Sequence, residues 1–422
     1  MIDSADLAKF VSDGVDLAKA GKAAELYNQI LPYFENSTLP VTSHYGFGWI
    51  TYYAIHQSGD ANFLQRKRML ATYMGLTLRR PHKLHSMILL EAIRLYRNLP
   101  DNDYRRPTAQ QPANKDIPAF SIIRFMELWK FANLREGDWR RKPVNGNITP
   151  STTEKLITCY IDELTSKPGL TPADDFLNIV NKALTQYPDS VNLLAQYAAL
   201  CQHSGDTTRA ADYLSRAILI SPTKPYLWQR LAAILPSDTN PRLKIALLYK
   251  ALTAPGQENF KGRIRLSLAS VMAESGAWQQ AAWEVEKVEK FYAANGWQLP
   301  GEGRRLKDLI PTGTQPADPT EAYRKIEHLA EEYLYNSLPS QEAKKTYHKP
   351  AQTPAPDSNP RHRAQLTAWR VTDSNGTNYW FNPAKHNIRE DLPHGTRLLI
   401  RTIGNRIVRA ELVESEMGKI DI

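Results

Sequence analysis

The sequence predicts a mostly α-helical protein that ends in a small β-domain, and three features of the chain support this fold class. Apolar residues recur with helical periodicity over residues 1–336, and in the middle of the chain the pattern repeats every 34 residues. Residues 337–363 hold five prolines and almost no large aliphatic side chains. From residue 364 onward, apolar and polar residues alternate, which is the period of a β-strand. We therefore expect an α-solenoid of helical hairpins, a linker and a small β-barrel.

Residues 1–150 have apolar faces typical of helices, but their spacing does not follow the 34-residue period. The expected helical segments are 4–34, interrupted at Gly21, and then 45–57, 63–78, 84–99 and 122–133. We interpret this region as degenerate helical repeats.

Residues 151–336 contain the clearest repeat. In one unit, a first helix presents Leu194, Tyr197, Ala198 and Cys201 on one face, and a second helix presents Ala210, Leu214 and Ala217. Gly205 separates the two helices. This 34-residue helix–turn–helix pattern resembles the tetratricopeptide repeat. The resemblance implies that a protein partner, still unknown, binds in the concave groove of the array. A polar capping helix over residues 322–335 is expected to close it.

Residues 337–363 are expected to form a flexible, proline-rich linker. The segment has one leucine and no valine, isoleucine or phenylalanine. Such a composition buries too little apolar surface to order a chain.

Residues 364–422 are expected to form the barrel. Candidate strands cover 366–371, 378–381, 396–402 and 407–413, with turn signals at Asn375-Gly376 and Gly404-Asn405. The segments LTAWRV, SNGT and YWFN resemble part of a cold-shock or S1-like oligonucleotide-binding (OB) fold. The first strand of that fold has no recognisable counterpart in this sequence.

The resemblance assigns a nucleic-acid-binding face to the barrel. Trp380 and Asn382 match an exposed aromatic residue and an exposed histidine of cold-shock domains, and Trp369 matches an exposed aromatic of the preceding strand. Lys385 is included with them as a basic residue of the same region. Exposed aromatic rings on such a face stack on bases. The alternative is that these rings fill the core of the barrel.

Positive charge is concentrated in residues 61–150. This segment has 17 Lys and Arg against 7 Asp and Glu, a net charge of +10, whereas the whole chain carries +9. If the basic residues share one face, they suit a phosphate backbone or an acidic protein. The alternative is a solvated surface whose charges point in several directions. The candidate phosphate-binding residues are Arg66, Lys67, Arg68, Arg79, Arg80, Lys83, Arg140 and Arg141.

The sequence gives little support for catalysis or metal binding. Two cysteines exclude a disulfide framework and a cysteine-built zinc site. The common phosphate-loop, dinucleotide, serine-hydrolase and zinc-protease motifs are missing from the sequence. His82 and His85 have a spacing suited to one helix face, but basic neighbours disfavour a cation there. We expect no catalytic residue, metal or cofactor. No apolar run approaches the roughly 20 residues that cross a bilayer, so we expect no membrane partner.

These observations favour a non-enzymatic adaptor. We expect a bacterial protein located in the cytoplasm. Its repeats would bind a protein partner, and its basic segment and barrel would bind RNA or single-stranded DNA. Two alternatives stay open. The first is a purely protein-binding scaffold that uses the barrel as a docking module. The second is an enzyme that acts on nucleic acid through a site the sequence does not reveal.

Overall fold

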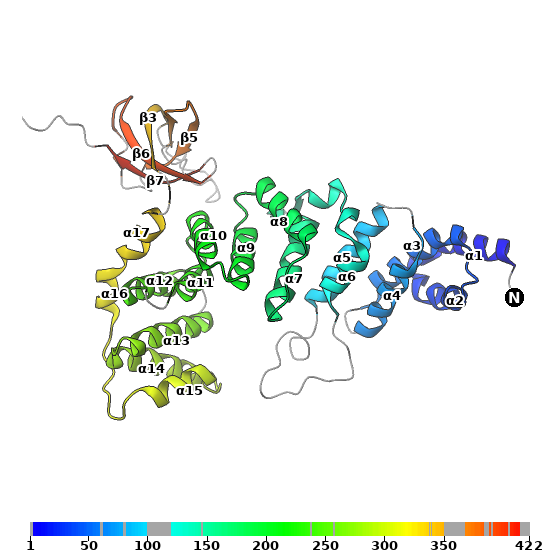
Figure 1. Cartoon of the computed structure of the whole chain (residues 1–422), viewed down its shortest axis with the longest axis horizontal. Helices are drawn as coiled ribbons and strands as arrows, with labels where there is room; N and C mark the ends of the chain where they lie inside the picture. Colours follow the sequence, from blue (N-terminus) through cyan, green and yellow to red (C-terminus); the bar gives the residue numbers. More distant parts are fainter. Residues whose placement is uncertain are drawn as a thin grey trace, which may run out of the picture. The chain divides into compact units, whose positions relative to one another are not determined.

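A computed structural model of the chain is mostly helical and ends in a curled antiparallel β-sheet that forms a half-barrel (Figure 1). The structure describes residues 3–413 apart from 60–61, 79–81, 99–119, 145–146, 237–238, 256–257, 337, 339, 350–367, 384–387, 390 and 404–405. The chain divides into two compact units, Met1–Tyr187 and Pro188–Ile422. We describe each unit by itself.

Unit 1 is built from helices at the positions that apolar periodicity predicts, including the interruption at Gly21, whose φ is 109°. A short antiparallel hairpin of β1 and β2, which the sequence analysis did not predict, precedes α7. The elements are α1 Ser4–Leu17, α2 Ala23–Glu35, α3 His44–Gln57, α4 Phe63–Gly75, α5 Lys83–Arg97, α6 Ile122–Trp129, β1 Lys142–Val144, β2 Asn147–Thr149, α7 Thr152–Ser166 and α8 Asp174–Gln186.

Helix α3 lies at the centre of the first half of unit 1, because two glycines let neighbouring helices approach it closely. A Cβ atom at Gly46 would lie 2.9 Å from Val11 of α1, and one at Gly48 would lie 2.9 Å from Leu84 of α5. Phe47 and Ile50, on the same helix, are fully buried. One side of α3 is therefore committed to the core.

Unit 2 begins with three helical hairpins. In the first, the small residues Ala198, Ala210 and Ala217 are buried, as the repeat pattern predicts. The first helices of the first two hairpins begin 34 residues apart, at Val191 and Pro225. The first helix of the third hairpin is longer, with 17 residues against 13 and 10 in the first two hairpins. The helices are α9 Val191–His203, α10 Thr207–Ile220, α11 Pro225–Ile234, α12 Pro241–Thr253, α13 Glu258–Glu274, α14 Trp278–Ala294, α15 Gly301–Leu309, α16 Thr320–Ile326 and α17 His328–Asn336.

The helix expected over residues 322–335 is present as two consecutive helices, α16 and α17, which pack against α12. A buried polar cluster fixes α16. The hydroxyl of Tyr323 donates to Glu284 of α14 at 2.8 Å, and Arg265 of α13 donates to the same carboxylate at 2.6 Å. Because Glu284 is 1% exposed, this carboxylate needs both partners.

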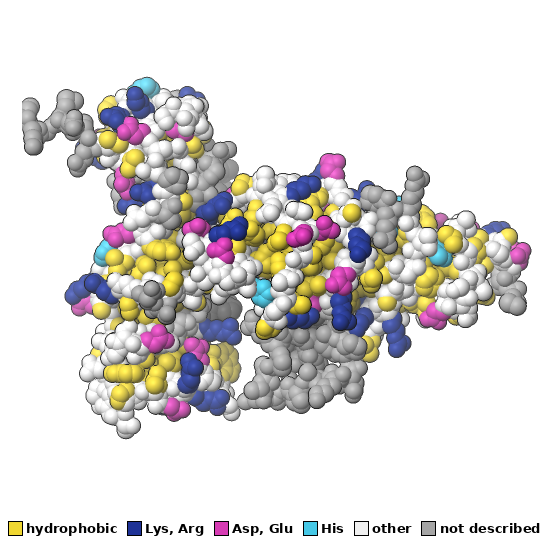
Figure 2. All heavy atoms as spheres, in the orientation of Figure 1, with side chains coloured by type: hydrophobic (Ala, Val, Ile, Leu, Met, Phe, Trp, Pro, Cys, Tyr) yellow, Lys and Arg dark blue, Asp and Glu magenta, His cyan; other side chains and the backbone are white. Residues whose placement is uncertain are grey.

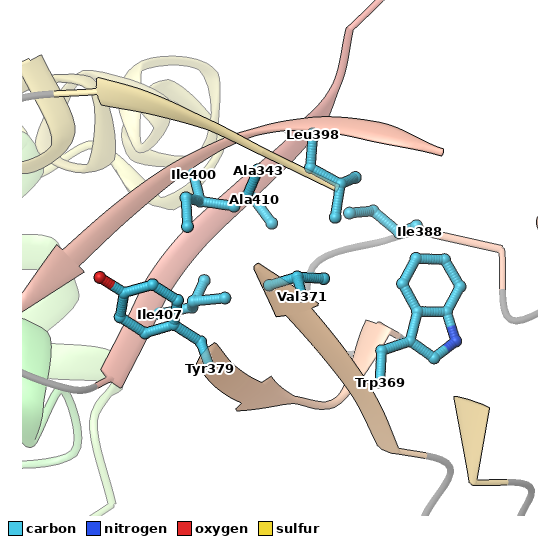
Figure 3. Packing of buried hydrophobic residues seen from close by; sticks show 9 residues of the cluster. All are labelled: Ala343, Trp369, Val371, Tyr379, Ile388, Leu398, Ile400, Ile407 and Ala410. Carbon is cyan, nitrogen blue, oxygen red and sulfur yellow. The ribbon is translucent and has the colours of Figure 1, made fainter. Parts of the chain in front are cut away.

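The half-barrel, called the barrel from here on, consists of five antiparallel strands in the order β5-β4-β3-β6-β7. Their bounds are β3 Ser340–Lys349, β4 Ala368–Asp373, β5 Asn378–Phe381, β6 Arg397–Ile403 and β7 Arg406–Leu412. The concave side holds the core shown in Figure 3, which consists of Ala343, Trp369, Val371, Tyr379, Ile388, Leu398, Ile400, Ile407 and Ala410.

The expected linker over 337–363 is wrong for residues 340–349, because β3 is the central strand of the sheet. This strand is the first of the five strands of the half-barrel, so the β-domain begins before residue 364. The composition of the segment does not indicate a strand, because the buried positions of β3 are Ala343 and Lys345 and not large apolar residues. The Lys345 ammonium donates to the Leu392 carbonyl and lies 4.0 Å from the centre of the Trp369 ring. Residues 350–363 lie outside the described residues.

Among the residues that the structure describes, each helix is too short or too polar to cross a membrane.

Candidate nucleic-acid interface

Trp369 belongs to the core of the barrel, so its assignment to an exposed binding face is wrong. Its side chain is 0% exposed and points inward from β4 together with Val371 (Figure 3). The registers explain the error. Trp369 lies opposite Phe381, whereas Trp380 lies opposite Arg370. Directly opposed residues of an antiparallel pair share a face, so Trp380 faces outward with Arg370.

Trp380 is 54% exposed and marks the outer face of β3, β4 and β5. Lys344 on β3 and Arg370 on β4 are also exposed on this face. Thr372 and Asn378 form another opposed pair and share a hydrogen bond of 2.8 Å between their side chains. We call the set Lys344, Thr346, Arg370, Thr372, Asn378 and Trp380 the outer strand face. It combines two cations and one large aromatic ring.

A buried carboxylate orders the turn between β4 and β5 and so fixes the register of the outer strand face. Asp373 accepts hydrogen bonds from the backbone NH groups of Asn375 and Thr377 and from the hydroxyl of Tyr379. Burial acts to raise the pKa of Asp373, but these hydrogen bonds outweigh it and hold that pKa below its usual value. Gly376 supplies the positive φ, 81°, that the turn requires.

Trp380 and Asn382 also line a cavity of about 550 Å³ within unit 2. The opposite walls come from α10, α11, α12 and α17, with apolar residues that include Leu219, Trp228 and Leu334. The barrel is joined to α17 beside this cavity, because Arg401 donates to the Tyr335 and Leu338 carbonyls. The guanidinium of Arg409 lies over the Tyr335 ring at 4.5 Å.

The cavity contains a cation shared by two acids. The Lys250 ammonium lies 2.7 Å from Glu327 and 2.8 Å from Glu331. Burial acts to lower the pKa of Lys250, but the hydrogen bonds and charges of the two carboxylates outweigh it and raise that pKa. The cluster carries a net negative charge, so the helical wall of the cavity does not attract phosphates.

Arg66 is part of the core of unit 1 and is not a surface residue. Its side chain is 4% exposed and pairs with Glu91, which is 2% exposed, at 3.3 Å. Glu91 also binds Arg94 at 2.6 Å and His56 at 2.9 Å. The assignment of Arg66 to phosphate binding is therefore wrong, because its charge neutralises a buried carboxylate.

Arg140 and Arg141 are both engaged within unit 1. The Arg141 guanidinium donates two hydrogen bonds to the Glu154 carboxylate, of 2.9 and 2.7 Å. The same guanidinium lies 4.1 Å from the centre of the Tyr187 ring. Arg140 is exposed and pairs with Glu136. Arg141 is thus a structural residue, and Arg140 remains accessible beside an acid.

Three of the other predicted basic residues lie in the described part of unit 1. Lys67 is half-buried, with a pKa lowered by burial, whereas Arg68 and Lys83 are exposed on α4 and α5. On the face shown in Figure 2, Lys and Arg side chains are interspersed with Asp and Glu side chains. Arg79, Arg80 and Lys385 lie outside the described residues.

The histidines and cysteines singled out by the sequence have structural roles. His85 is 1% exposed and hydrogen-bonds the Tyr73 hydroxyl at 2.7 Å, whereas His82 caps α5 by accepting from the Leu84 NH. Cys159 and Cys201 are buried, and burial raises the pKa of the Cys201 thiol. Within the described part of the chain, His, Cys, Asp and Glu side chains form no group of three or more that could hold a metal ion.

Sequence reasoning missed Lys344 and Arg370 of the outer strand face. Arg370 stands in the segment AWRV, whose alternation places it opposite in direction to Trp369. The alternation in the sequence therefore separates Arg370 from Trp369. It identifies Arg370 as exposed only if one already knows which face of the strand is buried. Lys344 lies in the segment that we expected to be a linker.

Comparison with known families gives one match. Residues 193–330, which span most of α9 through α16 and the start of α17, match a family described only as a domain of unknown function (DUF7017). No curated protein matches the chain.

Proposed function

We propose that this protein is a non-enzymatic adaptor that binds single-stranded nucleic acid, RNA or DNA, on the outer strand face of its barrel. Its helical hairpins bind a protein partner. The observation that carries the proposal is the pairing of a half-exposed tryptophan, Trp380, with a directly opposed arginine, Arg370, on one face of a small barrel.

The strand order supports an OB fold for the barrel. Counted from β3 as the first strand, the order in the sheet is 3-2-1-4-5, with β5 and β7 in contact. An OB fold is a five-stranded, partly open barrel that binds oligonucleotides on the face of its second and third strands. Those strands here are β4 and β5, which carry Arg370 and Trp380.

The chemistry of this face suits a single strand. A base can stack on Trp380, while Arg370 and Lys344 lie on the same face to meet phosphates. A base in a duplex is already stacked and paired, so its ring is not available to Trp380. We therefore expect single-stranded RNA or DNA to bind more tightly than a duplex of the same length.

The helical hairpins support the protein-binding half of the proposal. The second helices of the first two hairpins begin at Thr207 and Pro241, which are also 34 residues apart. This is the period of tetratricopeptide repeats, in which large residues of one hairpin pack on small residues of the next. Arrays of this kind present a groove to peptides or folded proteins.

Binding of a fluorescent single-stranded oligonucleotide of about 12 nucleotides to the full chain, over a salt series, tests the nucleic-acid half. Trp380→Ala should weaken binding by about 1–3 kcal/mol and leave the salt dependence nearly unchanged. Arg370→Ala should weaken binding and reduce the slope of log affinity against log salt by about 0.7.

Matched controls are available in unit 2. Trp297 is 50% exposed and Arg304 is exposed, and neither lies on the barrel. Trp297→Ala and Arg304→Ala should leave binding unchanged. Equal losses from Trp380→Ala and Trp297→Ala, or no binding by the unmodified chain at low salt, would contradict the proposal. The oligonucleotide should also remain intact after incubation with Mg²⁺, because the proposal assigns no catalysis to the chain.

The cavity beside Trp380 favours one second candidate, a scaffold that binds only proteins. Its apolar lining and its excess of carboxylates suit a polypeptide better than a phosphate backbone. This candidate predicts that Trp380→Ala leaves oligonucleotide binding unaffected. It also predicts that Trp380→Ala weakens binding of the protein partner. Thr223→Trp, which fills the cavity from its exposed rim, should then abolish binding of that same partner.

A further inference from the structure

A row of aromatic side chains follows the surface of α3 in unit 1. Tyr45, Trp49 and Tyr53 are spaced four residues apart and so lie along one side of the helix, about 6 Å apart along its axis. Tyr45 and Trp49 meet edge to face at 6.4 Å, and Trp49 and Tyr53 stack at 5.9 Å. His56, three residues after Tyr53, lies on the same side of the helix and stacks on the buried Tyr52 ring at 5.5 Å. We call Tyr45, Trp49, Tyr53 and His56 the aromatic row.

The aromatic row is not needed for the core of unit 1. The opposite side of α3 supplies that core through Phe47, Ile50 and Ile55, each 0% exposed. Tyr45 is 47% exposed, and Trp49 and Tyr53 are only partly buried. Exposed apolar side chains gathered in one patch mark interaction surfaces.

Positive charge continues from the end of this row. The Arg94 guanidinium of α5 lies 3.2 Å from the His56 ring nitrogen. Arg97, one turn further along α5, is exposed, as is Lys142 of β1. Helices α3, α5 and α7 follow one another in contact along unit 1 (Figure 1). Burial lowers the pKa of Lys155, on α7, and the charges of Arg97, Arg94 and Lys142 lower it further.

Two acids near these cations, both in the part of the chain that the structure describes, are already engaged. Glu91 is 2% exposed and binds Arg66, Arg94 and His56. Glu154, which acts to raise the pKa of Lys155, is held by both hydrogen bonds from Arg141. Arg94 shares the single charge of Glu91 with Arg66 and His56, so the charge of Arg94 is only partly offset. Arg94, Arg97 and Lys142 therefore repel the Lys155 ammonium, and an anionic ligand would relieve that repulsion.

We propose that the aromatic row and the cations Arg94, Arg97, Lys142 and Lys155 form a second binding site for single-stranded nucleic acid. Bases stack on Tyr45, Trp49 and Tyr53, and phosphates contact the cations. A row of rings beside a basic patch selects a ligand that carries both flat rings and negative charge. A purely acidic polypeptide would contact the cations but has no flat rings to stack on the aromatic row. The site lies wholly in unit 1 and does not rest on the function proposed for the barrel.

The test measures binding of fluorescent single-stranded DNA and RNA of about 12 nucleotides to the full chain in salt series. Trp49→Ala should weaken binding by about 5- to 140-fold with little change in salt dependence. The double variant Arg97→Ala/Lys142→Ala should weaken binding and reduce the salt slope by about 1.4. The control Lys9→Ala/Lys19→Ala removes the same charge from exposed positions of α1 and of the π-helical segment Ala18–Lys22 that follows it. This control should change neither quantity.

Each variant is also made in the Trp380→Ala chain, so that the two sites are separated. If Trp49→Ala has no effect in either background while Trp380→Ala does, this inference is overturned and the barrel proposal stands. The reverse pattern overturns the barrel proposal only. Polyglutamate of similar length serves as a competitor. Displacement of the oligonucleotide by polyglutamate at equal charge concentration, with Trp49→Ala silent, identifies an acidic polypeptide as the ligand and overturns the assignment to nucleic acid.

Discussion

Trp369 and Trp380 lie on neighbouring strands of the barrel but face opposite sides of the sheet. Trp369 is fully buried under the Lys345 ammonium, and Trp380 is half exposed. We therefore expect Trp369 to contribute to the stability of the barrel and Trp380 to contribute to binding. Burial of an indole contributes several kcal/mol through lost apolar surface and filled volume, whereas an exposed indole contributes little.

We expect Trp369→Ala to lower the free energy of unfolding of the barrel by about 3–5 kcal/mol, since it leaves a large cavity in the core. Trp380→Ala should change that free energy by less than about 0.5 kcal/mol. Urea unfolding followed by near-ultraviolet circular dichroism measures both. Similar losses in the two variants would mean that Trp380 is a core residue.

Arg66 provides a second contrast, because its predicted role was phosphate binding and its structural role is to neutralise a buried acid. We expect Arg66→Ala to destabilise unit 1 by about 3 kcal/mol, the lower end of the range for a broken buried pair, since Glu91 keeps Arg94 and His56. Arg68→Ala, at the exposed neighbouring position, should leave stability unchanged. The midpoints of thermal unfolding of the two variants test this expectation. An unaltered midpoint for Arg66→Ala would contradict a buried Arg66–Glu91 ion pair.

At the scale of single elements, β3 has the greatest consequence for the barrel. It pairs with β4 on one side and β6 on the other, so its backbone donates and accepts hydrogen bonds in both directions. Ala343 lies opposite Asp373 and Leu398. Proline at such a position removes a ladder donor and is not tolerated in a central strand.

We therefore expect Ala343→Pro to unfold the barrel and leave the helical hairpins folded. Hydrogen exchange of the full chain should show loss of protection in peptides from β4 and β6 and unchanged protection in α9 and α10. Lys344→Ala, at the next and outward-facing position, serves as the control. Retained protection of β4 in the proline variant would mean that β3 is not part of the sheet.

The turn between β4 and β5 depends on an ionised carboxylate. Because the folded-state pKa of Asp373 is held below its usual value of about 3.9, its contribution to stability is complete at neutral pH. That contribution disappears as the pH falls through the depressed folded-state pKa. Asp373→Asn should destabilise the barrel at pH 7 and abolish the part of the acid sensitivity that this residue causes. Unfolding curves at pH 7 and pH 3 test it, and equal acid sensitivity in both proteins would contradict this role.

At the scale of the whole molecule, periodicity predicts the helices well because it reflects burial directly. The small residues Ala198, Ala210 and Ala217 are buried as expected, and the break at Gly21 is where a positive φ is needed. Composition is a weaker guide. It assigned β3 to a linker, because a central strand is ordered by its two neighbours and not by its own apolar content.

The candidate site is less predictable than the fold, for two physical reasons. Strand parity groups residues by face, but it does not say which face is buried, so Trp369 and Trp380 could not be told apart from alternation alone. Charges adjacent in sequence point about 100° apart around a helix. The run Arg66-Lys67-Arg68 therefore yields one buried, one half-buried and one exposed cation, and not a basic patch.

We propose above that the outer strand face of the barrel binds single-stranded nucleic acid. The most direct measurement is photo-crosslinking of the full chain to a single-stranded oligonucleotide of about 12 nucleotides, with mass spectrometry to locate the attached residues. We predict crosslinks in β5 at or beside Trp380, lost in Arg370→Ala at moderate salt and retained in Arg304→Ala. Crosslinks that avoid β4 and β5 entirely, under conditions in which the oligonucleotide is bound, would contradict the claim.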